Sequence, residues 1–248
     1  MKIDFYYWAT QCPINYETLS LFDKYKDKID IYTYNIERDY DLAKNNKMFF
    51  PFLTVLNDKK RFRAPITSSL LDKLLNDEKY DEKPYIIDFG KEKYKGNIIP
   101  LNKDNISLIS KKCTMTNCCC SCDKKALFLS KYCDEIFGYL NVENDNVLGG
   151  AEYMPSKYVP YDIPKNDDYA FLTCLYHSSI EYDYKYYPLL ELENYLKKIY
   201  TKIYAITDEI GTFPNGNLMW FLEQGYIDEG VITEEENYCR LHLVSNNI

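Results

Sequence analysis

The stretch Phe171-Leu172-Thr173-Cys174-Leu175-Tyr176-His177 is a strongly apolar run in the second half of the chain. A short run of this kind, bounded by polar residues, is typical of a buried strand. After a polar loop, residues 188–199 place apolar side chains on one helical stripe, formed by Leu189, Leu192, Leu196 and Ile199. Residues 203–206 then predict another strand. This order of strand, helix and strand indicates an α/β unit.

The sequence on either side extends this unit. Residues 139–141 and 147–153 predict an antiparallel pair of strands joined by the polar turn Glu143-Asn144-Asp145-Asn146. The other elements expected here are strands at 98–101 and 239–244 and helices at 105–111, 124–137 and 218–224, the last one ending at Gly225. These elements place a domain over residues 96–248.

The first segment predicts the order β-α-β-α-β-β-α over residues 1–78, and the charged residues 79–95 are expected to form a linker. Pro13 would occupy the first position of a helix, where its missing N–H removes no hydrogen bond. Residues 29–36 carry apolar side chains on both faces, which is the pattern of a central strand. The other elements expected here are strands at 2–8, 52–56 and 61–63 and helices at 39–47 and 68–75.

The composition is that of a globular protein, with 248 residues of which 46% are hydrophobic and 27% charged. The formal net charge of −8 gives no broad electrostatic reason to expect a nucleic-acid partner. The sequence holds no run of about 18 apolar residues, so we expect no membrane span. Asp4 interrupts the apolar start, so we expect no signal peptide and a cytoplasmic location, in which the nine cysteines stay reduced.

Two stretches of the first segment resemble the thioredoxin fold. Trp8-Ala9-Thr10-Gln11-Cys12-Pro13-Ile14-Asn15 follows the first expected strand, and Phe50-Pro51 precedes the third. In that family the corresponding turn carries Cys-x-x-Cys at a helix start, with a cis proline beside it. Cys12 fills the first cysteine position and Asn15 the second, so the resemblance implies a thioredoxin-like domain without the disulfide pair.

Cys12 has two interpretations. The N–H groups and the dipole of a helix start favour a thiolate, which would make Cys12 a reactive or monothiol group. Alternatively, Cys12 only packs against its helix or caps it.

The second segment resembles the acetyltransferases of the GNAT superfamily. The resemblance rests on residues 171–199 together with Gly149-Gly150-Ala151-Glu152-Tyr153-Met154-Pro155-Ser156 and Leu218-Met219-Trp220-Phe221-Leu222-Glu223-Gln224-Gly225-Tyr226. It covers most of residues 96–248. It implies an α+β domain with a mixed sheet, acetyl-CoA as acyl donor, and a small-molecule or protein amine or thiol as acceptor.

In that family a loop with the pattern Gln/Arg-x-x-Gly-x-Gly/Ala follows the central strand and binds the pyrophosphate of coenzyme A through backbone N–H groups. Here the loop reads Glu181-Tyr182-Asp183-Tyr184-Lys185-Tyr186-Tyr187-Pro188, in which tyrosines replace the glycines and Lys185 alone favours phosphate. The residues that the resemblance assigns to the cofactor are Cys174, Leu175, Tyr176, Tyr184, Lys185, Tyr186, Asn215 and Asn217. For Asn215 and Asn217, a plain turn and helix cap is the alternative.

The candidate catalytic residues of this segment are Glu152 and His177. The tyrosine acid of the family falls on Phe221, so that role does not carry over. Glu152, or His177 after desolvation, would act as a base near neutral pH, while N–H groups of residues 174–176 polarise the acetyl carbonyl. For His177, a purely structural role is the alternative.

Five of the nine cysteines fall within residues 113–122, at Cys113, Cys118, Cys119, Cys120 and Cys122. Thiolates at short spacing hold Zn²⁺ or a soft ion such as Cu(I), and Cys113, Cys118, Cys120 and Cys122 are the candidate ligands. Redox-active thiols and local packing without a ligand are the alternatives.

The sequence therefore favours an acetyltransferase-like protein with an N-terminal thioredoxin-like domain. The alternative function is a non-enzymatic module that handles thiols or metals and retains both folds as scaffolds.

Overall fold

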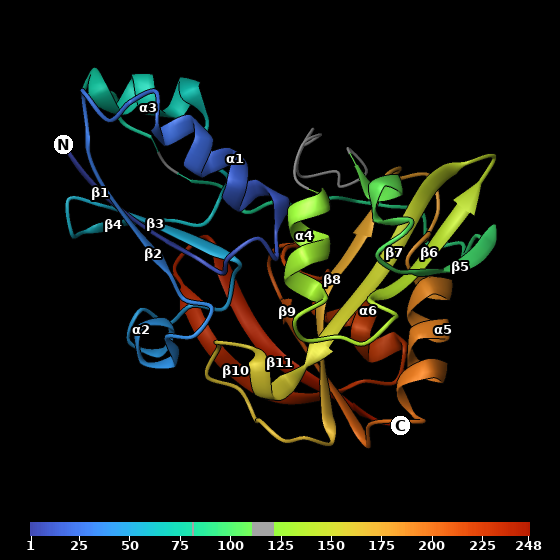
Figure 1. The fold of residues 1–248 in the computed structure, drawn as a ribbon. Helices are drawn as coiled ribbons and strands as arrows, with labels where there is room; N and C mark the ends of the chain where they lie inside the picture. The colour runs from blue at the N-terminus through green and yellow to red at the C-terminus, as the bar shows by residue number, and fades with distance from the viewer. Residues whose placement is uncertain (81, 111–121) are drawn as a thin grey trace. The chain divides into compact units, whose positions relative to one another are not determined.

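The computed structural model describes residues 1–80, 82–110 and 122–248. The chain forms two compact units (Figure 1). The first contains Met1–Lys83 together with Pro160–Asp162, and the second contains Pro84–Val159 together with Ile163–Ile248. The linker was expected at 79–95; residues 79–83 belong to the first unit and residues 84–95 to the second.

The first unit is a four-stranded sheet with the strand order β2-β1-β3-β4. Its elements are β1 (Lys2–Tyr7), α1 (Pro13–Phe22), β2 (Asp30–Asn35), α2 (Tyr40–Asn45), β3 (Phe52–Leu56), β4 (Lys60–Phe62) and α3 (Ser68–Leu75). Strand β1 pairs parallel with β2 and antiparallel with β3. The order of elements agrees with the order expected from the sequence, while the thioredoxin resemblance itself stays a prediction.

Strand β2 lies at an edge of this sheet, so the prediction of a central strand was wrong. Its tyrosines and isoleucine produce an apolar pattern on both faces, but no residue of the strand is buried, and Tyr32 is 51% exposed. The hydroxyl of Tyr34 instead donates to Asp4 Oδ1 at 3.1 Å. Tyrosine fits a half-exposed strand because its ring packs while its hydroxyl stays polar.

The turn before α1 is held by the side chain of Asn15. Its Nδ2 donates to the carbonyl oxygens of Trp8, Ala9 and Pro51, at 3.3, 3.0 and 3.1 Å. Asn15 is fully buried, so the amide satisfies carbonyl groups that water does not reach. Among the described residues Phe213–Pro214 is the one cis peptide, so the Phe50–Pro51 bond is trans, unlike the cis proline of the thioredoxin pattern.

The second unit is a seven-stranded mixed sheet with the order β10-β11-β9-β8-β7-β6-β5 (Figure 1). Its elements are β5 (Asn97–Leu101), η1 (Ile106–Ile109), α4 (Cys122–Leu129), β6 (Gly138–Glu143), β7 (Asn146–Pro155), η2 (Ser156–Tyr158), β8 (Tyr169–His177), α5 (Tyr186–Leu196), β9 (Lys202–Asp208), α6 (Leu218–Glu223), β10 (Ile227–Glu235) and β11 (Cys239–Asn247). The β8–β9 pair is parallel, and the other neighbours are antiparallel.

Three elements of this unit differ from the expectation. Strand β10 was not predicted, because its exposed and charged residues and the positive φ of Gly230 hide the strand pattern. Helix α4 ends at Leu129 rather than near residue 137, and the helix expected at 105–111 is a short 3-10 turn.

Strands β8 and β9 diverge after their first residues. Pairing runs only from Tyr169 with Lys202 to Phe171 with Tyr204. We call the place where the two strands part, bordered by 172–177 and 205–208, the fork. Strands β7 and β8 instead pair along their length, with Glu152 opposite Cys174 and one irregularity after that pair. Glu152 therefore lies on a paired strand and not at the fork.

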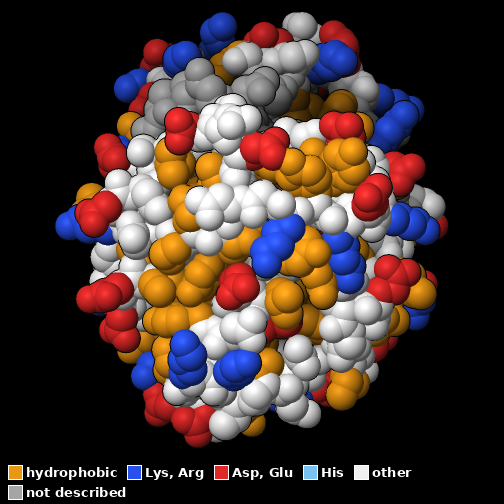
Figure 2. Space-filling model, turned by 90° about the vertical axis from the view of Figure 1, so that its right-hand side faces the viewer, with side chains coloured by type: hydrophobic (Ala, Val, Ile, Leu, Met, Phe, Trp, Pro, Cys, Tyr) orange, Lys and Arg blue, Asp and Glu red, His pale blue; other side chains and the backbone are white. Residues whose placement is uncertain are grey.

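Tyrosine contributes to both the core and the surface. Tyr153, Tyr161 and Tyr226 are buried, whereas Tyr40 and Tyr158 are exposed. On the face shown in Figure 2, hydrophobic side chains, among which tyrosines are counted, lie between acidic and basic ones. The tyrosines are therefore divided between the core and the surface.

Replacing Asn15 by Ala should destabilise the first unit by about 1–3 kcal/mol, because three carbonyl oxygens each lose a hydrogen bond from a buried amide. Urea unfolding monitored by hydrogen exchange of β1 amides measures this loss. Ser20→Ala on the exposed side of α1 is the matched control and should change stability by less than about 0.5 kcal/mol. Equal stability of the two variants would show that Asn15 does not hold the turn.

Candidate functional site

The fork is bridged by Asn215. Its Oδ1 accepts the N–H of Leu175 at 3.2 Å, and its Nδ2 donates to the carbonyl oxygens of Ile206 at 2.9 Å and Leu172 at 3.4 Å. The side chain thus connects β8 to β9 after their own pairing has ended. The Leu175 N–H that the sequence assigned to an acetyl carbonyl donates here to Asn215.

The loop that carries Asn215 is fixed to β9 and to α6. The hydroxyl of Thr207 donates to the carbonyl oxygen of Gly216 at 2.6 Å. Asn217 Oδ1 accepts the N–H of Met219 at 2.9 Å, so Asn217 caps α6, as the structural alternative for this residue predicts.

Asp183 occupies the N-terminus of α5, where a pyrophosphate was expected. Its Oδ1 accepts the N–H groups of Lys185 and Tyr186, both at 3.2 Å, and its Oδ2 accepts Trp220 Nε1 at 2.7 Å. The carboxylate therefore takes the N–H groups of the N-cap residue and of the first helical residue, and adds negative charge beside them. This role of Asp183 was not predicted, although Asp is common in the residues just before a helix, where its side chain accepts backbone N–H groups.

Lys185 is buried inside the second unit. Its ammonium donates to the carbonyl oxygen of Asn215 at 3.1 Å and lies 3.8 Å from the centre of the Trp220 ring. Burial lowers the pKa of Lys185 to about 7, although the charge of Asp183 partly opposes the shift. With this pKa, the ammonium of Lys185 can lose its proton near neutral pH.

His177 is a neutral, buried imidazole. Burial, with a smaller contribution from the Lys185 charge, lowers the pKa of His177 to about 3. Its ring lies 4.4 Å from that of Phe89, and neither nitrogen has a hydrogen-bond partner among the described residues. A group with so low a pKa is a poor base at neutral pH.

A cavity of about 50 Å³ lies at the fork. The predicted site residues that line it are Cys174, Leu175, Tyr176, His177, Lys185 and Asn215. Tyr184, Tyr186 and Asn217 lie outside this lining. The Tyr184 ring packs against Tyr94, and Tyr186 lies beneath the ammonium of Lys93, 3.5 Å from the ring centre.

Glu152 lies apart from that lining, in an ion pair with Lys125. Lys125 Nζ is 2.6 Å from Glu152 Oε2, and both side chains are buried. The carboxylate of Glu152 would have to leave this pair before it could accept a proton, so the arrangement argues for a structural role.

The cysteine candidates are distributed over both units. Cys12, in the first unit, is the half-buried N-cap of α1 and makes no capping hydrogen bond with its side chain. Cys113, Cys118, Cys119 and Cys120 lie outside the described residues. Cys122 begins α4, and burial raises the pKa of its thiol. The part of the chain that is described holds no group of three candidate metal ligands.

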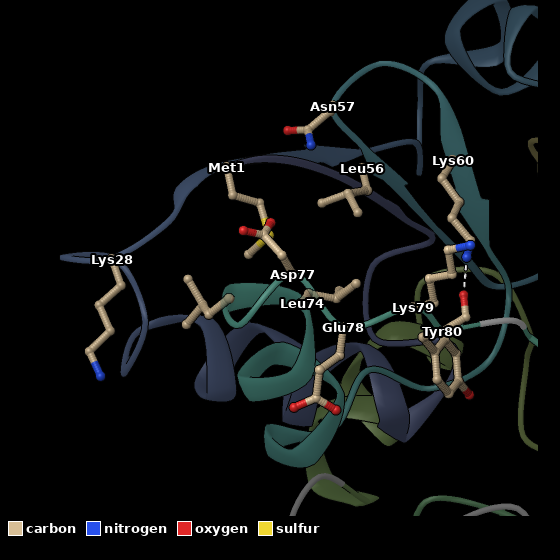
Figure 3. Close-up of a pocket in the computed structure, with 11 residues that line it drawn as sticks. Met1, Lys28, Leu56, Asn57, Lys60, Leu74, Asp77, Glu78, Lys79 and Tyr80 are labelled. Carbon is tan, nitrogen blue, oxygen red and sulfur yellow. Dashed lines mark hydrogen bonds between the residues drawn. The ribbon is translucent and has the colours of Figure 1, made fainter.

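A larger hollow of about 570 Å³ is present in the first unit (Figure 3). Met1, Leu56 and Leu74 line it together with charged side chains, and the Lys60 ammonium donates to the carbonyl oxygen of Tyr80. It contains none of the predicted site residues.

A helix that spans a membrane must be long and apolar, and the described residues form none.

Comparison with known proteins finds similar solved structures only. No family model matches the chain, and no curated protein matches it. An N-acetyltransferase from Staphylococcus aureus is 13% identical, covers 62% of this chain and 99% of its own, and has a TM-score of 0.45. An aminoglycoside 6′-N-acetyltransferase from Enterococcus faecium is 15% identical over 61% of this chain and 96% of its own, with a TM-score of 0.42. A ribosomal-protein-alanine N-acetyltransferase from Brucella melitensis is 11% identical over 61% of this chain and 99% of its own, with a TM-score of 0.43.

The pKa of Lys185 predicts a pH-dependent stability. Because that pKa is about 7 in the folded chain and 10.5 ordinarily, the unfolded chain holds more protons between these values. The free energy of unfolding of the wild type, relative to Lys185→Met, should therefore rise with pH from about 7 to 10, by at most about 1.4 kcal/mol per pH unit. Urea unfolding at several pH values measures it. For Lys198→Met, at an exposed site, the difference in free energy of unfolding from the wild type should not change with pH. The same result for Lys185→Met would contradict the lowered pKa of Lys185.

Breaking the Lys125–Glu152 pair should destabilise the second unit. Glu152→Gln leaves the ammonium of Lys125 buried without its counter-charge, which costs about 3–5 kcal/mol. Lys124→Met, an exposed charge on the same helix, is the control and should cost less than about 1 kcal/mol. Thermal and urea unfolding compare the variants. Wild-type stability of Glu152→Gln would reopen the role of this carboxylate as a base.

Proposed function

We propose that the second unit is an acyltransferase that uses acetyl-CoA as donor and an amine or thiol as acceptor. The observation that carries the proposal is the fork. Two parallel strands part there, and the loop at 178–185 leads from the first of them into α5. Ligands of α/β sheets bind at the carboxyl ends of strands, where the sheet opens in this way.

The residues at the fork support part of this chemistry. The acceptor atom attacks the carbonyl carbon of the thioester, the bond from that carbon to sulfur breaks, and the acceptor's proton ends on the departing thiolate, directly or through a base. His177 and Glu152 are poorly suited as that base. Lys185 suits it better, because its pKa of about 7 matches neutral pH and it lines the cavity.

A second candidate function is a non-enzymatic module with an acetyltransferase-like scaffold. It is favoured by the N-terminus of α5, where the N–H groups of Lys185 and Tyr186 already donate to Asp183. A pyrophosphate would meet a carboxylate there instead of free donors. In this alternative the thiol of Cys12, or the cysteines at 113–122, would carry the function.

Titration calorimetry with millimolar acetyl-CoA separates the two candidates. For an acyltransferase, Asp183→Asn should bind the donor at least about tenfold more tightly than the wild type, because it removes a negative charge beside the pyrophosphate and retains a hydrogen-bond acceptor. Asp167→Asn, an exposed carboxylate elsewhere in the unit, should bind as the wild type does.

The gain in Asp183→Asn should shrink as salt is added, since it is electrostatic. Neither heat nor thermal shift with any of the three proteins, at any salt concentration, would favour the non-enzymatic module.

A further inference from the structure

Residues 85–94 lie across the fork and are bonded at three places to the loops that follow β8 and β9. At the first, Thr212 N–H and Thr212 Oγ1 donate to the carbonyl oxygen of Tyr85 at 2.8 and 2.9 Å, and Thr212 Oγ1 accepts the N–H of Ile87 at 3.1 Å. At the second, the N–H of Gly90 donates to the carbonyl oxygen of Ile180 at 2.9 Å. We call residues 85–94 the strap.

The third place is the loop before α5. The N–H of Asp183 donates to the carbonyl oxygen of Glu92 at 2.9 Å, and the N–H of Tyr94 donates to the carbonyl oxygen of Asp183 at 3.2 Å. Lys93 and Asp183 form a parallel bridge between the two segments. The strap thus binds the backbone of the same loop that the acyl donor is proposed to contact.

The strap also fills the space above the polar groups of the fork. Phe89 lies against His177, and its ring centre is 5.1 Å from the ammonium of Lys185. Tyr85, Ile87 and Phe89 are part of the cavity lining. A cavity of about 50 Å³ has room for water-sized molecules but not for a coenzyme. The cavity at the fork therefore does not admit a donor while the strap is in place. A hollow of about 510 Å³ lies on the other side of the strap, where Asp183 and Trp220 help to line it.

The strap differs from the elements beneath it in burial. No residue from 84 to 96 is buried, and Ile86 is 63% exposed, whereas β8 and β9 contain buried residues along most of their length. Segments held by hydrogen bonds with little buried apolar surface open locally at much lower free energy than the core does. The strap can therefore leave the fork while the sheet stays folded.

We propose that residues 85–94 are an autoinhibitory strap, which must leave the fork before an acyl donor binds there. This inference rests on the proposed acyltransferase function. A binding site that is open only for a fraction of the time has an apparent dissociation constant raised by the inverse of that fraction. A strap that is closed about 99% of the time would thus weaken donor binding about 100-fold.

Gly90 provides the sharpest test. A Cβ at this position would lie 1.9 Å from the carbonyl oxygen of Glu181, which is backbone and cannot move aside as a flexible side chain would. Gly90→Val should therefore expel the strap. Thr212→Val is a second variant, which removes both hydroxyl hydrogen bonds of the strap without a clash. Ile86→Ala, on the same segment but with an exposed side chain, is the matched control.

Hydrogen exchange first reports whether the strap has left. In Gly90→Val or Thr212→Val, the amides of Ile87, Asp183 and Tyr94 should lose protection while those of β8 and β9 keep it. Calorimetry with acetyl-CoA then measures affinity, which should be at least tenfold higher in a variant with a released strap than in the wild type or Ile86→Ala. Should Gly90→Val fail to fold, Thr212→Val decides alone.

The outcomes separate the two proposals. Equal donor affinity in the wild type and a strap-released variant would overturn autoinhibition and leave the acyltransferase proposal standing. A released strap with no donor binding in any protein would overturn the acyltransferase proposal and the strap's role with it. Loss of protection throughout the sheet, in both variants, would show that the segment is part of the folded core and not a strap.

Discussion

Strands β8 and β9 stop pairing after Phe171 and Tyr204, and the backbone groups beyond that point need other partners. Buried N–H and C=O groups are almost always bonded, so parting two central strands obliges other segments to fill the gap. The side chain of Asn215 supplies some of these partners, because it forms hydrogen bonds with backbone groups of both strands. The strap and the loop before α5 lie over the same region. The parting of the strands thus explains why three segments distant in sequence meet there.

The electrostatics of the fork follow from this crowding. An open cleft would leave Lys185 hydrated and charged, but here aromatic rings and backbone surround it, and its pKa falls towards neutrality. His177 responds to the same burial and loses its basicity. Asp183 remains beside the α5 N-terminus, where the helix dipole and two amides favour a negative charge. The protein's own carboxylate thus sits where an anionic ligand would be stabilised.

Much of the second unit could be predicted from the sequence, because its periodic segments are long and clearly bounded. The strand at 171–177, the stripe from Leu189 to Leu196 and the hairpin around 143–146 gave the correct elements. Strand β10 was missed, since an exposed edge strand of charged residues has no apolar alternation to detect. Strand β2 was placed wrongly, because tyrosines give an apolar pattern in an exposed strand as readily as in a covered one.

The site was harder to predict than the fold. Cys174, His177, Lys185 and Asn215 were expected at one site and do line one cavity, because they lie on or after two strands that part at the same place. The partners that decide their chemistry lie elsewhere in the chain. Phe89 and Thr212 belong to segments without a motif, and the pairing of Glu152 with Lys125 depends on packing between a strand and a helix far apart in sequence.

The amide of Asn15 has a consequence for the first unit. Where the thioredoxin pattern has a second sulfur, this chain closes the turn with a side chain that is neither oxidised nor reduced under cellular conditions. The turn around Cys12 therefore holds one sulfur, and no disulfide can form within it. Oxidation of Cys12 would need a thiol from outside the turn or would stop at the single sulfur.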